Sequence, residues 1–392
     1  MGWNWATELA RLGHRVSVLT RADNRAAIER DSRAQLSNLS FIYYDLPPWM
    51  QRWRTSFVGK VLYYMLWQAR AVRRVRELFP ELPFDAVQHV TYASVRYPSF
   101  MESLRIPFYF GPVSGGERVP RQLRADFSAW ERWREWLRGL SNLMVQYDPL
   151  LRKVFRTAKE IVVTRDTLEL IPQRWRYKCR TLLAIGLSRD YLDHAASEVK
   201  RSAHGVRLLY VGRLMECKGI DIALHAVRLL KVSHPDVHFT IVGAGPEKSN
   251  LQKRARELGL SEIVEWTGWL SQCAVQDRYR TADVFLFPGL RDSGAMVVLE
   301  AMAHGLPVVC ADLGGPGVIV NQTCGRVVAT HDCNRQQLAI GFAAALREII
   351  STPGLWGGLA AGARTRAREF EFQNLVRTVY LDLPPDTLGP ER

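Results

Sequence analysis

The chain has 392 residues, 47% of them hydrophobic, which is enough to fill two cores and excludes an intrinsically disordered chain. No apolar run reaches the roughly 18 residues that a membrane-spanning helix needs, and Asn4, Thr7 and Glu8 within the first ten residues argue against a secretory signal. The net charge is +14, and residues 1–190, with 31 Lys and Arg against 18 Asp and Glu, hold almost all of this excess.

Helical and strand-like patterns alternate along the first half of the chain. We expect helices over residues 2–12 and 49–78, and strands over residues 15–19, 41–44, 86–89, 108–111 and 161–164. Strands separated by helices indicate a parallel sheet that is covered on both faces.

The second half repeats this alternation more clearly. Strands are expected over residues 207–211, 238–242, 263–266, 284–287 and 307–310, and helices over residues 220–233, 248–258, 275–281 and 297–304. This is the pattern of a doubly wound open sheet, which binds ligands at the carboxyl ends of its strands. A hinge is expected at residues 184–205 and a frayed tail after residue 383.

Two cations follow the first strand of the second half. Gly212 allows a close turn where this strand ends, and Arg213 and Lys218 stand five residues apart. Arg offers a planar fork and Lys a mobile point charge, so a diphosphate is a natural partner for both. The alternative is a strand-end Arg beside a solvated Lys.

A second loop combines a helix start with two carboxylates. The free N–H groups after Ser293 and Gly294 would form an anion site. Asp292 precedes them, and Glu300 lies two turns into a helix of Val, Leu, Ala and Met. Because carboxylates accept hydrogen bonds from hydroxyls, the pair suits a polyol such as ribose or hexose. An isolated Ser-Gly can equally be a plain helix cap.

Together these motifs resemble the retaining glycosyltransferases of family 4, which have the GT-B fold. The resemblance covers residues 206–328 and depends on four motifs in matching order: Val211-Gly212-Arg213-Leu214 with Lys218-Gly219, Gly243-Ala244-Gly245-Pro246, Thr267-Gly268-Trp269-Leu270, and Asp292 with Glu300. The first half matches less densely, through residues 88–91 and 110–117.

The resemblance implies an α/β fold of two Rossmann-like, doubly wound domains that face a cleft. Residues 1–190 would form the N-terminal acceptor-binding domain, and residues 206–365 would bind the nucleotide-sugar donor. A helix over residues 366–383 would cross back to the first domain.

A reaction and a set of site residues are also implied. A hexose-type sugar would pass from a nucleotide sugar to a sugar, a lipid-linked acceptor or another glycan, with retention of anomeric configuration, in polysaccharide, glycolipid or glycoconjugate synthesis. The donor diphosphate would contact Arg213, Lys218, Ser293, Gly294, Ala295 and Met296. The nucleoside would contact Glu300, Trp266, Gly268, Trp269 and Leu270, with Glu300 on the ribose hydroxyls.

The same resemblance gives a catalytic and an acceptor set. His89, Asp292 and Glu300 would be catalytic, and Gly115, Gly116 and Glu117 would lie on the acceptor side. For His89, the alternative is a satisfied histidine at a strand end. The sequence has no Asp-x-Asp, so we expect neither a metal site nor a cofactor, and the two cations would neutralise the leaving diphosphate instead.

Three features depart from the family pattern. Asp292 stands where Glu is usual, so its carboxylate keeps the charge but is one methylene shorter, and Asp292→Glu is expected to be tolerated. Ala295 stands where Gly or Phe is common. The chain also begins inside the first helix, so the first strand and the Gly-rich loop of the N-terminal domain are missing, and an apolar seam would be exposed. A start assigned downstream of the true one and a truncated, non-catalytic remnant are the two interpretations.

Two runs combine Trp with Arg, at residues 49–74 and 130–138. Cationic helices with Trp on one face lie well at a lipid interface, which would give a cytoplasmic enzyme with peripheral contact to an anionic membrane. Alternatively, the Trp side chains pack into the core of the first domain and the Arg side chains face water.

Other functions fit parts of the same sequence. The basic half could contact nucleic acid, but no helix-turn-helix, zinc-finger or RNP-like pattern is present, so no nucleic-acid partner is expected. A nucleotide-sugar epimerase of the same fold is the alternative enzyme. The six scattered cysteines predict reduced thiols in a cytoplasmic protein.

Overall fold

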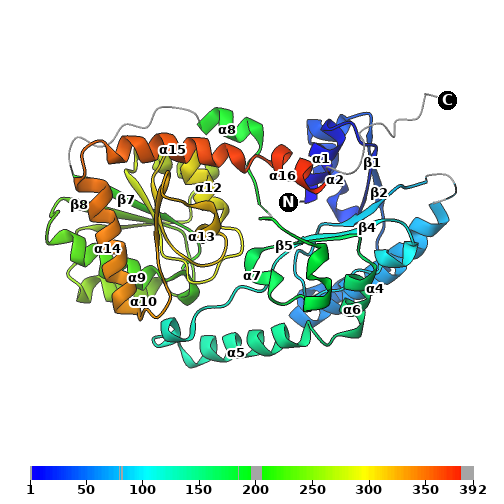
Figure 1. Ribbon diagram of the computed structural model, residues 1–392, viewed down its shortest axis with the longest axis horizontal. Helices are drawn as coiled ribbons and strands as arrows, with labels where there is room; N and C mark the ends of the chain where they lie inside the picture. Colours follow the sequence, from blue (N-terminus) through cyan, green and yellow to red (C-terminus); the bar gives the residue numbers. More distant parts are fainter. Residues whose placement is uncertain (1, 79, 81–82, 184, 196–204, 381–392) are drawn as a thin grey trace. The chain divides into compact units, whose positions relative to one another are not determined.

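The computed structural model describes residues 2–78, 80, 83–183, 185–195 and 205–380. The chain divides into two compact units (Figure 1). Unit 1 comprises Met1–Gly116, Asn142–Ala184 and Phe372–Arg392, and unit 2 comprises Glu117–Ser141 and Ile185–Glu371. Both units have parallel strands with helices between them, which confirms the predicted α/β class and its two Rossmann-like domains.

Unit 1 contains two separate parallel sheets among its described residues. One pairs β1 (Val16–Thr20) with β2 (Leu39–Tyr43), and the other has the order β3 (Val87–His89), β4 (Phe108–Val113), β5 (Glu160–Val163) and β6 (Cys179–Thr181). All six residues of β4 are buried, because this strand is central and apolar on both faces. The predicted helix over residues 49–78 is broken into α3 (Pro48–Gln51) and α4 (Phe57–Leu78), because Ser56 between them is extended.

Helix α1 (Gly2–Arg11) packs on both sheets of unit 1. Ala6 and Ala10 lie against Leu39 of β2, whereas Trp5 packs with Tyr109 of β4 and its indole N–H donates to Gln88 Oε1 at 2.9 Å. Every residue of β1 is only half-buried. Helix α1 therefore covers part of the apolar surface of both sheets.

The last described helix, α16 (Phe372–Val379), belongs to unit 1. Its Val376 and Val379 are buried in the cluster that holds Trp5 and Tyr109, together with Tyr380. One helix was predicted over residues 366–383. The structure instead has two helices in this region: α15 (Leu355–Glu369) ends at Glu369, and α16 begins at Phe372. Residues 381–383 and the predicted frayed tail lie outside the described residues.

Unit 2 contains one parallel sheet of six strands in the order β12-β11-β10-β7-β8-β9. The strands are β7 (Val206–Val211), β8 (Val237–Val242), β9 (Val264–Gly268), β10 (Val284–Phe287), β11 (Val308–Ala311) and β12 (Gly325–Val328). Most are apolar runs, as expected when helices cover both faces. The order reverses between β7 and β10, and this switch point is where such sheets bind ligands at their carboxyl ends.

The helices of unit 2 follow its strands in alternation. They are α8 (Arg189–Ala195), α9 (Ile220–Lys231), α10 (Lys248–Glu257), α11 (Gln272–Thr281), α12 (Met296–Ala303), α13 (Pro316–Ile319), α14 (Arg335–Ser351) and α15. Helix α8 occupies part of the predicted hinge at residues 184–205, and the rest of that segment is largely outside the described residues.

The segment Glu117–Ser141 belongs to unit 2, although the sequence placed it in a first domain of residues 1–190. The reason is a set of long-range charge contacts. Arg335 of α14 donates to the backbone oxygen of Leu123 at 2.6 Å and pairs with Asp126 at 3.0 Å. Further contacts come from α5 (Ala129–Met144), whose carboxylates are described with the site below.

The two Trp- and Arg-rich runs have different environments. In the first, Met50 and Tyr63 are buried, and of its Trp and Tyr side chains only Trp49 is strongly exposed, at 61%, so the aromatic residues of this run mostly pack into a core. In the second, Trp130, Trp133 and Trp136 are all exposed, so the core interpretation is wrong for these three residues.

No single helix within the described ranges is long and apolar enough to cross a bilayer, and only α14 and α15 taken together, bent by 106°, satisfy that criterion. All six cysteines are unpaired.

Candidate active site

The loops that follow β7 and β10 meet at the carboxyl edge of the unit 2 sheet. Lys218 ends the short turn Glu216–Lys218 after β7, and its ammonium pairs with the Asp292 carboxylate from the loop after β10. The N–H of Leu290 donates to the Cys217 oxygen at 3.0 Å. Gly219 is left-handed, with φ of 64°, and a Cβ there would lie 2.4 Å from the Pro288 oxygen. Only glycine therefore allows the two loops to approach this closely.

Asp292 organises its own loop as well as Lys218. Its Oδ1 accepts hydrogen bonds from the N–H groups of Gly294 at 3.3 Å and Ala295 at 2.9 Å. Two of the N–H groups predicted to contact phosphate thus already bind a carboxylate, which is the preference expected at a helix start. A Cβ on Gly314 would lie 2.0 Å from the backbone oxygen of Asp292, so a second loop also packs closely here.

Ala295 is left-handed, with φ of 55° and ψ of 61°, at the residue that precedes α12. This conformation costs an L-residue about 1–2 kcal/mol and costs glycine little. A left-handed backbone is a physical reason for Gly at this position, but not for the Phe that the resemblance also allows. The side chain of Ala295 is 7% exposed, so the packing around it keeps the backbone in this unfavourable conformation.

We expect Asp292→Glu to separate the two tasks of this carboxylate. The longer side chain can still reach Lys218, but it cannot accept from Gly294 and Ala295 in the same tight turn. Loss of such a cap costs about 0.5–2 kcal/mol, so the melting temperature should fall while nucleoside diphosphate affinity stays close to wild type. Calorimetry of unfolding and of binding measures both. Asp292→Asn is the matched control, because it keeps the turn and removes the charge; a glutamate variant as stable as wild type would show that the turn contributes nothing.

Glu300 of α12 is held by a buried tyrosine. Its Oε2 accepts from the hydroxyl of Tyr279 of α11 at 3.1 Å, and Tyr279 is fully buried. Burial raises the pKa of Glu300, and the Tyr279 hydrogen bond opposes that rise. The Tyr279 ring also lies 5.3 Å from the ring of His304. Tyr279 was not identified from the sequence, because no local motif marks a residue that acts across two helices.

The remaining residues of the predicted donor site lie at the same edge. Arg213 is exposed just after β7 and has no ion-pair partner within the part of the chain that the structure describes. Ser293 and Met296 are half-buried around the start of α12. At the end of β9, Gly268 is left-handed and its oxygen accepts from the Gly243 N–H at 2.8 Å.

The segment predicted to contact the nucleoside base continues from β9. Trp266 and Leu270 are half-buried, whereas Trp269 is 81% exposed. An indole that protrudes from the carboxyl edge is available for stacking on a flat ring. The structure thus assembles the predicted donor residues of unit 2 along one edge of one sheet.

His89 and the two predicted acceptor glycines belong to unit 1. The Nε2 atom of His89 lies 3.0 Å from the hydroxyl of Tyr64, and the Tyr64 ring stacks on Tyr92 at 3.9 Å. Burial lowers the pKa of His89 to about 4, so the imidazole is neutral at pH 7. The Gly116 N–H donates to Thr167 Oγ1 at 3.0 Å, and Gly115 has a positive φ of 119°. Glu117, predicted beside them, is buried and begins the segment of unit 2.

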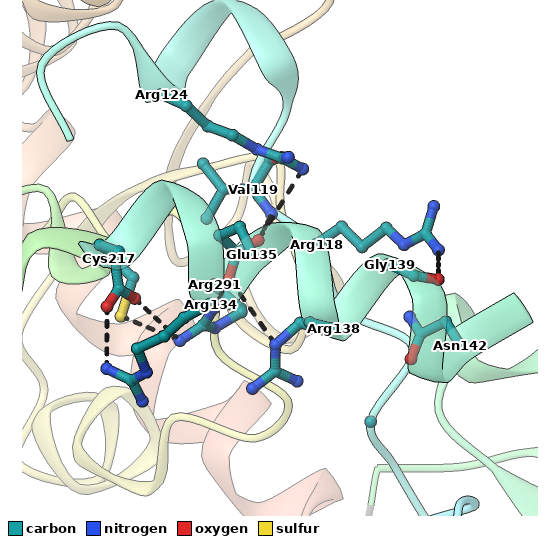
Figure 2. A network of polar contacts seen from close by, with 12 residues as sticks. Arg118, Val119, Arg124, Arg134, Glu135, Arg138, Gly139, Asn142, Cys217 and Arg291 are labelled. Carbon is teal, nitrogen blue, oxygen red and sulfur yellow. Dashed lines mark hydrogen bonds and ion pairs between the residues drawn. The ribbon is translucent and has the colours of Figure 1, made fainter. Parts of the chain in front are cut away.

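A cluster of buried charge lies directly beside Asp292. The Arg291 guanidinium pairs with Glu135 and lies 3.6 Å from Glu131, both on α5, and it donates to Cys217 Sγ at 3.5 Å (Figure 2). The Glu135 side chain has no exposed surface and that of Arg291 is 13% exposed. Sequence reasoning missed this cluster, because Arg291 and α5 are distant in the chain. Breaking a buried pair of this kind leaves an uncompensated charge and costs about 3–5 kcal/mol.

Two further features of unit 2 bear on where a ligand binds. A hollow of about 530 Å³ lies at the opposite, amino-terminal edge of β7, β8 and β9, between Arg207, His238 and Ser261. Two of its charged lining residues are paired, Arg278 with Glu265 of the same lining and Arg207 with Asp283. No group of three or more His, Cys, Asp or Glu suited to a metal occurs in the residues that the structure describes.

The part of the chain that holds these loops is similar to known glycosyltransferases. The family model described as glycosyl transferases group 1 matches residues 198–351. A D-inositol 3-phosphate glycosyltransferase of Streptomyces coelicolor is 31% identical over 43% of this chain and 38% of its own length. A glycogen synthase of Mycobacterium tuberculosis is 31% identical over 44% and 42%. The matched region thus spans about two fifths of these curated relatives.

Solved structures match over almost the whole chain at lower identity. A glycosyltransferase from Rickettsia africae superposes with a TM-score of 0.62 and 15% identity, over 97% of this chain and 92% of its own. A sucrose-phosphate synthase from Thermosynechococcus elongatus gives 0.61 and 17%, over 96% and 90%. Anabaena HepE in complex with UDP and glucose gives 0.57 and 15%, over 98% and 96%. The neighbours share the GT-B fold, which confirms the predicted fold, and residues 198–351 match the model of the group 1 glycosyl transferases, the family that the donor-side motifs resemble.

Proposed function

We propose that this protein is a glycosyltransferase that takes a hexose-type sugar from a nucleotide-sugar donor. The observation that carries the proposal is the arrangement of Lys218, Asp292 and Glu300 at the switch point of a group 1 domain. A cation, a helix start and a carboxylate held by a tyrosine fit the diphosphate and the ribose of one nucleotide. Binding of UDP and glucose by Anabaena HepE, which has a similar fold, agrees with this choice of ligand.

Each part of the donor has a proposed partner. Arg213 and Lys218 neutralise the diphosphate, with Ser293, Gly294, Ala295 and Met296 along its path. Glu300 accepts from the ribose hydroxyls, and the segment of Trp266, Gly268, Trp269 and Leu270 lies against the base. Asp292 competes with the diphosphate for Lys218 in the free protein, because the ammonium already pairs with this carboxylate.

The proposed chemistry retains the anomeric configuration. The bond between the anomeric carbon and the departing diphosphate oxygen breaks, and the acceptor oxygen bonds to the same face. The acceptor proton passes to the departing phosphate oxygen. Arg213 and Lys218 stabilise the charge that develops on that group, and no metal is assigned to this step. Neutral His89 is proposed to donate a hydrogen bond to the sugar, Asp292 is proposed as a second catalytic residue, and Gly115, Gly116 and Glu117 are proposed for the acceptor side.

The acceptor is proposed to be a sugar, a lipid-linked sugar or another glycan, as in polysaccharide, glycolipid or glycoconjugate synthesis. The enzyme would act in the cytoplasm with peripheral contact to an anionic membrane, because a lipid-linked acceptor is met there. The strongly basic residues 1–190 support an anionic partner of this kind.

A donor panel tests the proposal. The purified protein is incubated with UDP-, GDP- and ADP-hexoses and a set of glycosyl lipids, with and without a chelator. We expect acceptor-dependent release of nucleoside diphosphate that survives chelation, and NMR of the product should show the anomer of the donor. Interconversion of the donor sugar without an acceptor would instead identify an epimerase. No release from any pair, with intact nucleoside diphosphate binding, would indicate a non-catalytic remnant.

A further inference from the structure

Helix α5 buries charge and exposes aromatic rings. Glu131 and Glu135 are 5% and 2% exposed, whereas Trp130 and Trp136 are 64% and 62% exposed. A surface helix of a folded protein ordinarily turns its apolar stripe inward and its charges outward. In α5 the two carboxylates face inward and the tryptophans face outward. The outer surface of α5 therefore differs from that of an ordinary solvent-exposed helix and calls for a separate explanation.

The exposed apolar residues of α5 lie on one face of the helix. They recur at intervals of three and four residues, which places them one above the other. This set, the α5 apolar face, consists of Trp130, Trp133, Trp136, Leu140, Leu143 and Met144. The rings of Trp130 and Trp133 stack with centroids 4.9 Å apart. Single exposed apolar side chains are ordinary, but a contiguous row with three tryptophans marks an interaction surface.

The buried carboxylates explain why this face stays outside. Arg291, Arg124 and Arg138 surround the Glu135 carboxylate, with Arg138 Nε 3.6 Å from its Oε1 and Arg124 Nη2 3.8 Å from its Oε2 (Figure 2). Glu131 and Glu135 are four residues apart and face inward together. Rotating α5 to bury the tryptophans would remove both carboxylates from these arginines, so the charge cluster fixes the orientation of the helix.

The surroundings of the α5 apolar face are cationic. Arg132 of α5 is exposed, exposed Arg118 donates to the backbone oxygen of Gly139 of α5 at 3.0 Å, and both acidic residues of α5 itself are buried and paired. A second copy of this face would present the same arginines and be repelled. An anionic lipid surface fits both properties, because Trp side chains settle at the headgroup level and arginines attract anionic headgroups.

We propose that the α5 apolar face docks on an anionic phospholipid surface, with Trp130, Trp133 and Trp136 at the level of the headgroups. This inference deepens the peripheral membrane contact of the proposed function, and it does not require the protein to be catalytically active. The proposal does not assign membrane docking to the first Trp-rich run, because its Met50 and Tyr63 are buried in a hydrophobic core.

Vesicle sedimentation with the full chain tests the docking. Wild type is expected to sediment with vesicles of phosphatidylcholine and phosphatidylglycerol and to remain in solution with phosphatidylcholine alone. Trp130→Ala with Trp133→Ala and Trp136→Ala should reduce the partition at least about tenfold, since apolar insertion is lost. Tyr177→Ala is the matched control, because Tyr177 is 80% exposed outside this face. Wild-type protein that stays in solution with both vesicle types, or a triple variant that sediments like wild type, would overturn the proposal.

Two further measurements distinguish membrane docking by α5 from docking by the other Trp-rich run and from dimerisation. A loss of sedimentation in Trp49→Ala with Trp53→Ala, with α5 intact, would assign the contact to the other run and overturn the inference. Analytical ultracentrifugation without lipid must show the same mass for wild type and the triple variant, because an α5-dependent dimer would make the face a protein interface. The triple variant should bind nucleoside diphosphate as tightly as wild type. Failure of the proposed glycosyl transfer would leave the sedimentation result unchanged.

Discussion

Lys218→Ala is expected to weaken nucleoside diphosphate binding by about tenfold to a hundredfold. Charge-assisted hydrogen bonds contribute about 1.5–3 kcal/mol, and the Lys218 side chain is only 15% exposed and held in place by Asp292. An already positioned cation loses little side-chain entropy when the diphosphate arrives. Arg213→Ala should lie at the lower end of the same range, because Arg213 is exposed and has more freedom to lose.

Part of the Lys218→Ala effect must come from Asp292. Without its cation, the carboxylate is left facing the diphosphate and repels it. The double variant Lys218→Ala with Asp292→Asn removes that repulsion, and comparison with the two single variants measures the coupling. Titration calorimetry gives the affinities, and Lys253→Ala on the exposed face of α10 is the control. Unchanged affinity in both Arg213→Ala and Lys218→Ala would reject the diphosphate assignment.

The second large effect is expected at Glu300. Glu300→Gln should weaken nucleoside diphosphate binding by about tenfold or more, because an ionised carboxylate accepts from two ribose hydroxyls more strongly than an amide. Burial raises the pKa of Glu300, so its ionised form is lost as the pH falls toward that raised pKa. Wild-type affinity should therefore decline on acidification, and the Gln variant should lack this component. Loss of folding in Glu300→Gln, without a specific binding effect, would make the residue structural.

The raised pKa of Glu300 also makes the free energy of unfolding depend on pH. A carboxyl whose folded pKa is raised keeps its proton to higher pH in the folded state than in the unfolded chain, where the pKa is about 4.3. Its contribution to stability is therefore largest at low pH and is lost as the pH rises through the folded pKa. In the ligand-free protein, Glu300→Gln should remove this pH dependence from the unfolding free energy.

Tyr279→Phe distinguishes positioning from packing at this site. The variant keeps the buried ring and removes the hydroxyl that donates to Glu300. That hydrogen bond lowers the pKa of Glu300, so its loss should move the acidic decline of binding to higher pH. A pH profile identical to that of wild type would show that Tyr279 only packs.

The sequence singled out those residues of the proposed site whose chemistry is local. Lys218 and Asp292 each follow a strand in a short motif, and parallel strands bring such loops together at one edge. No local motif marks Tyr279 or Glu135, because each contacts a residue that is distant in the sequence, Glu300 and Arg291 respectively. Ala295 was recognised as unusual, but its reason, a left-handed backbone, required the structure. The orientation of α5 was likewise unpredictable, since its Trp periodicity fits an inward face as well as an outward one.

The assignment of Glu117–Ser141 to unit 2 governs how a donor-binding fragment can be made. A contiguous fragment of residues 185–371 would carry every predicted donor contact but would lack Glu131, Glu135 and Asp126. Arg291 and Arg335 would then be buried cations without these partners, and Arg291 adjoins the loop that holds Lys218. We therefore expect a stable fragment to need residues 117–141, joined by an engineered linker to residue 185, because truncation of the gene at residue 185 removes part of unit 2 itself.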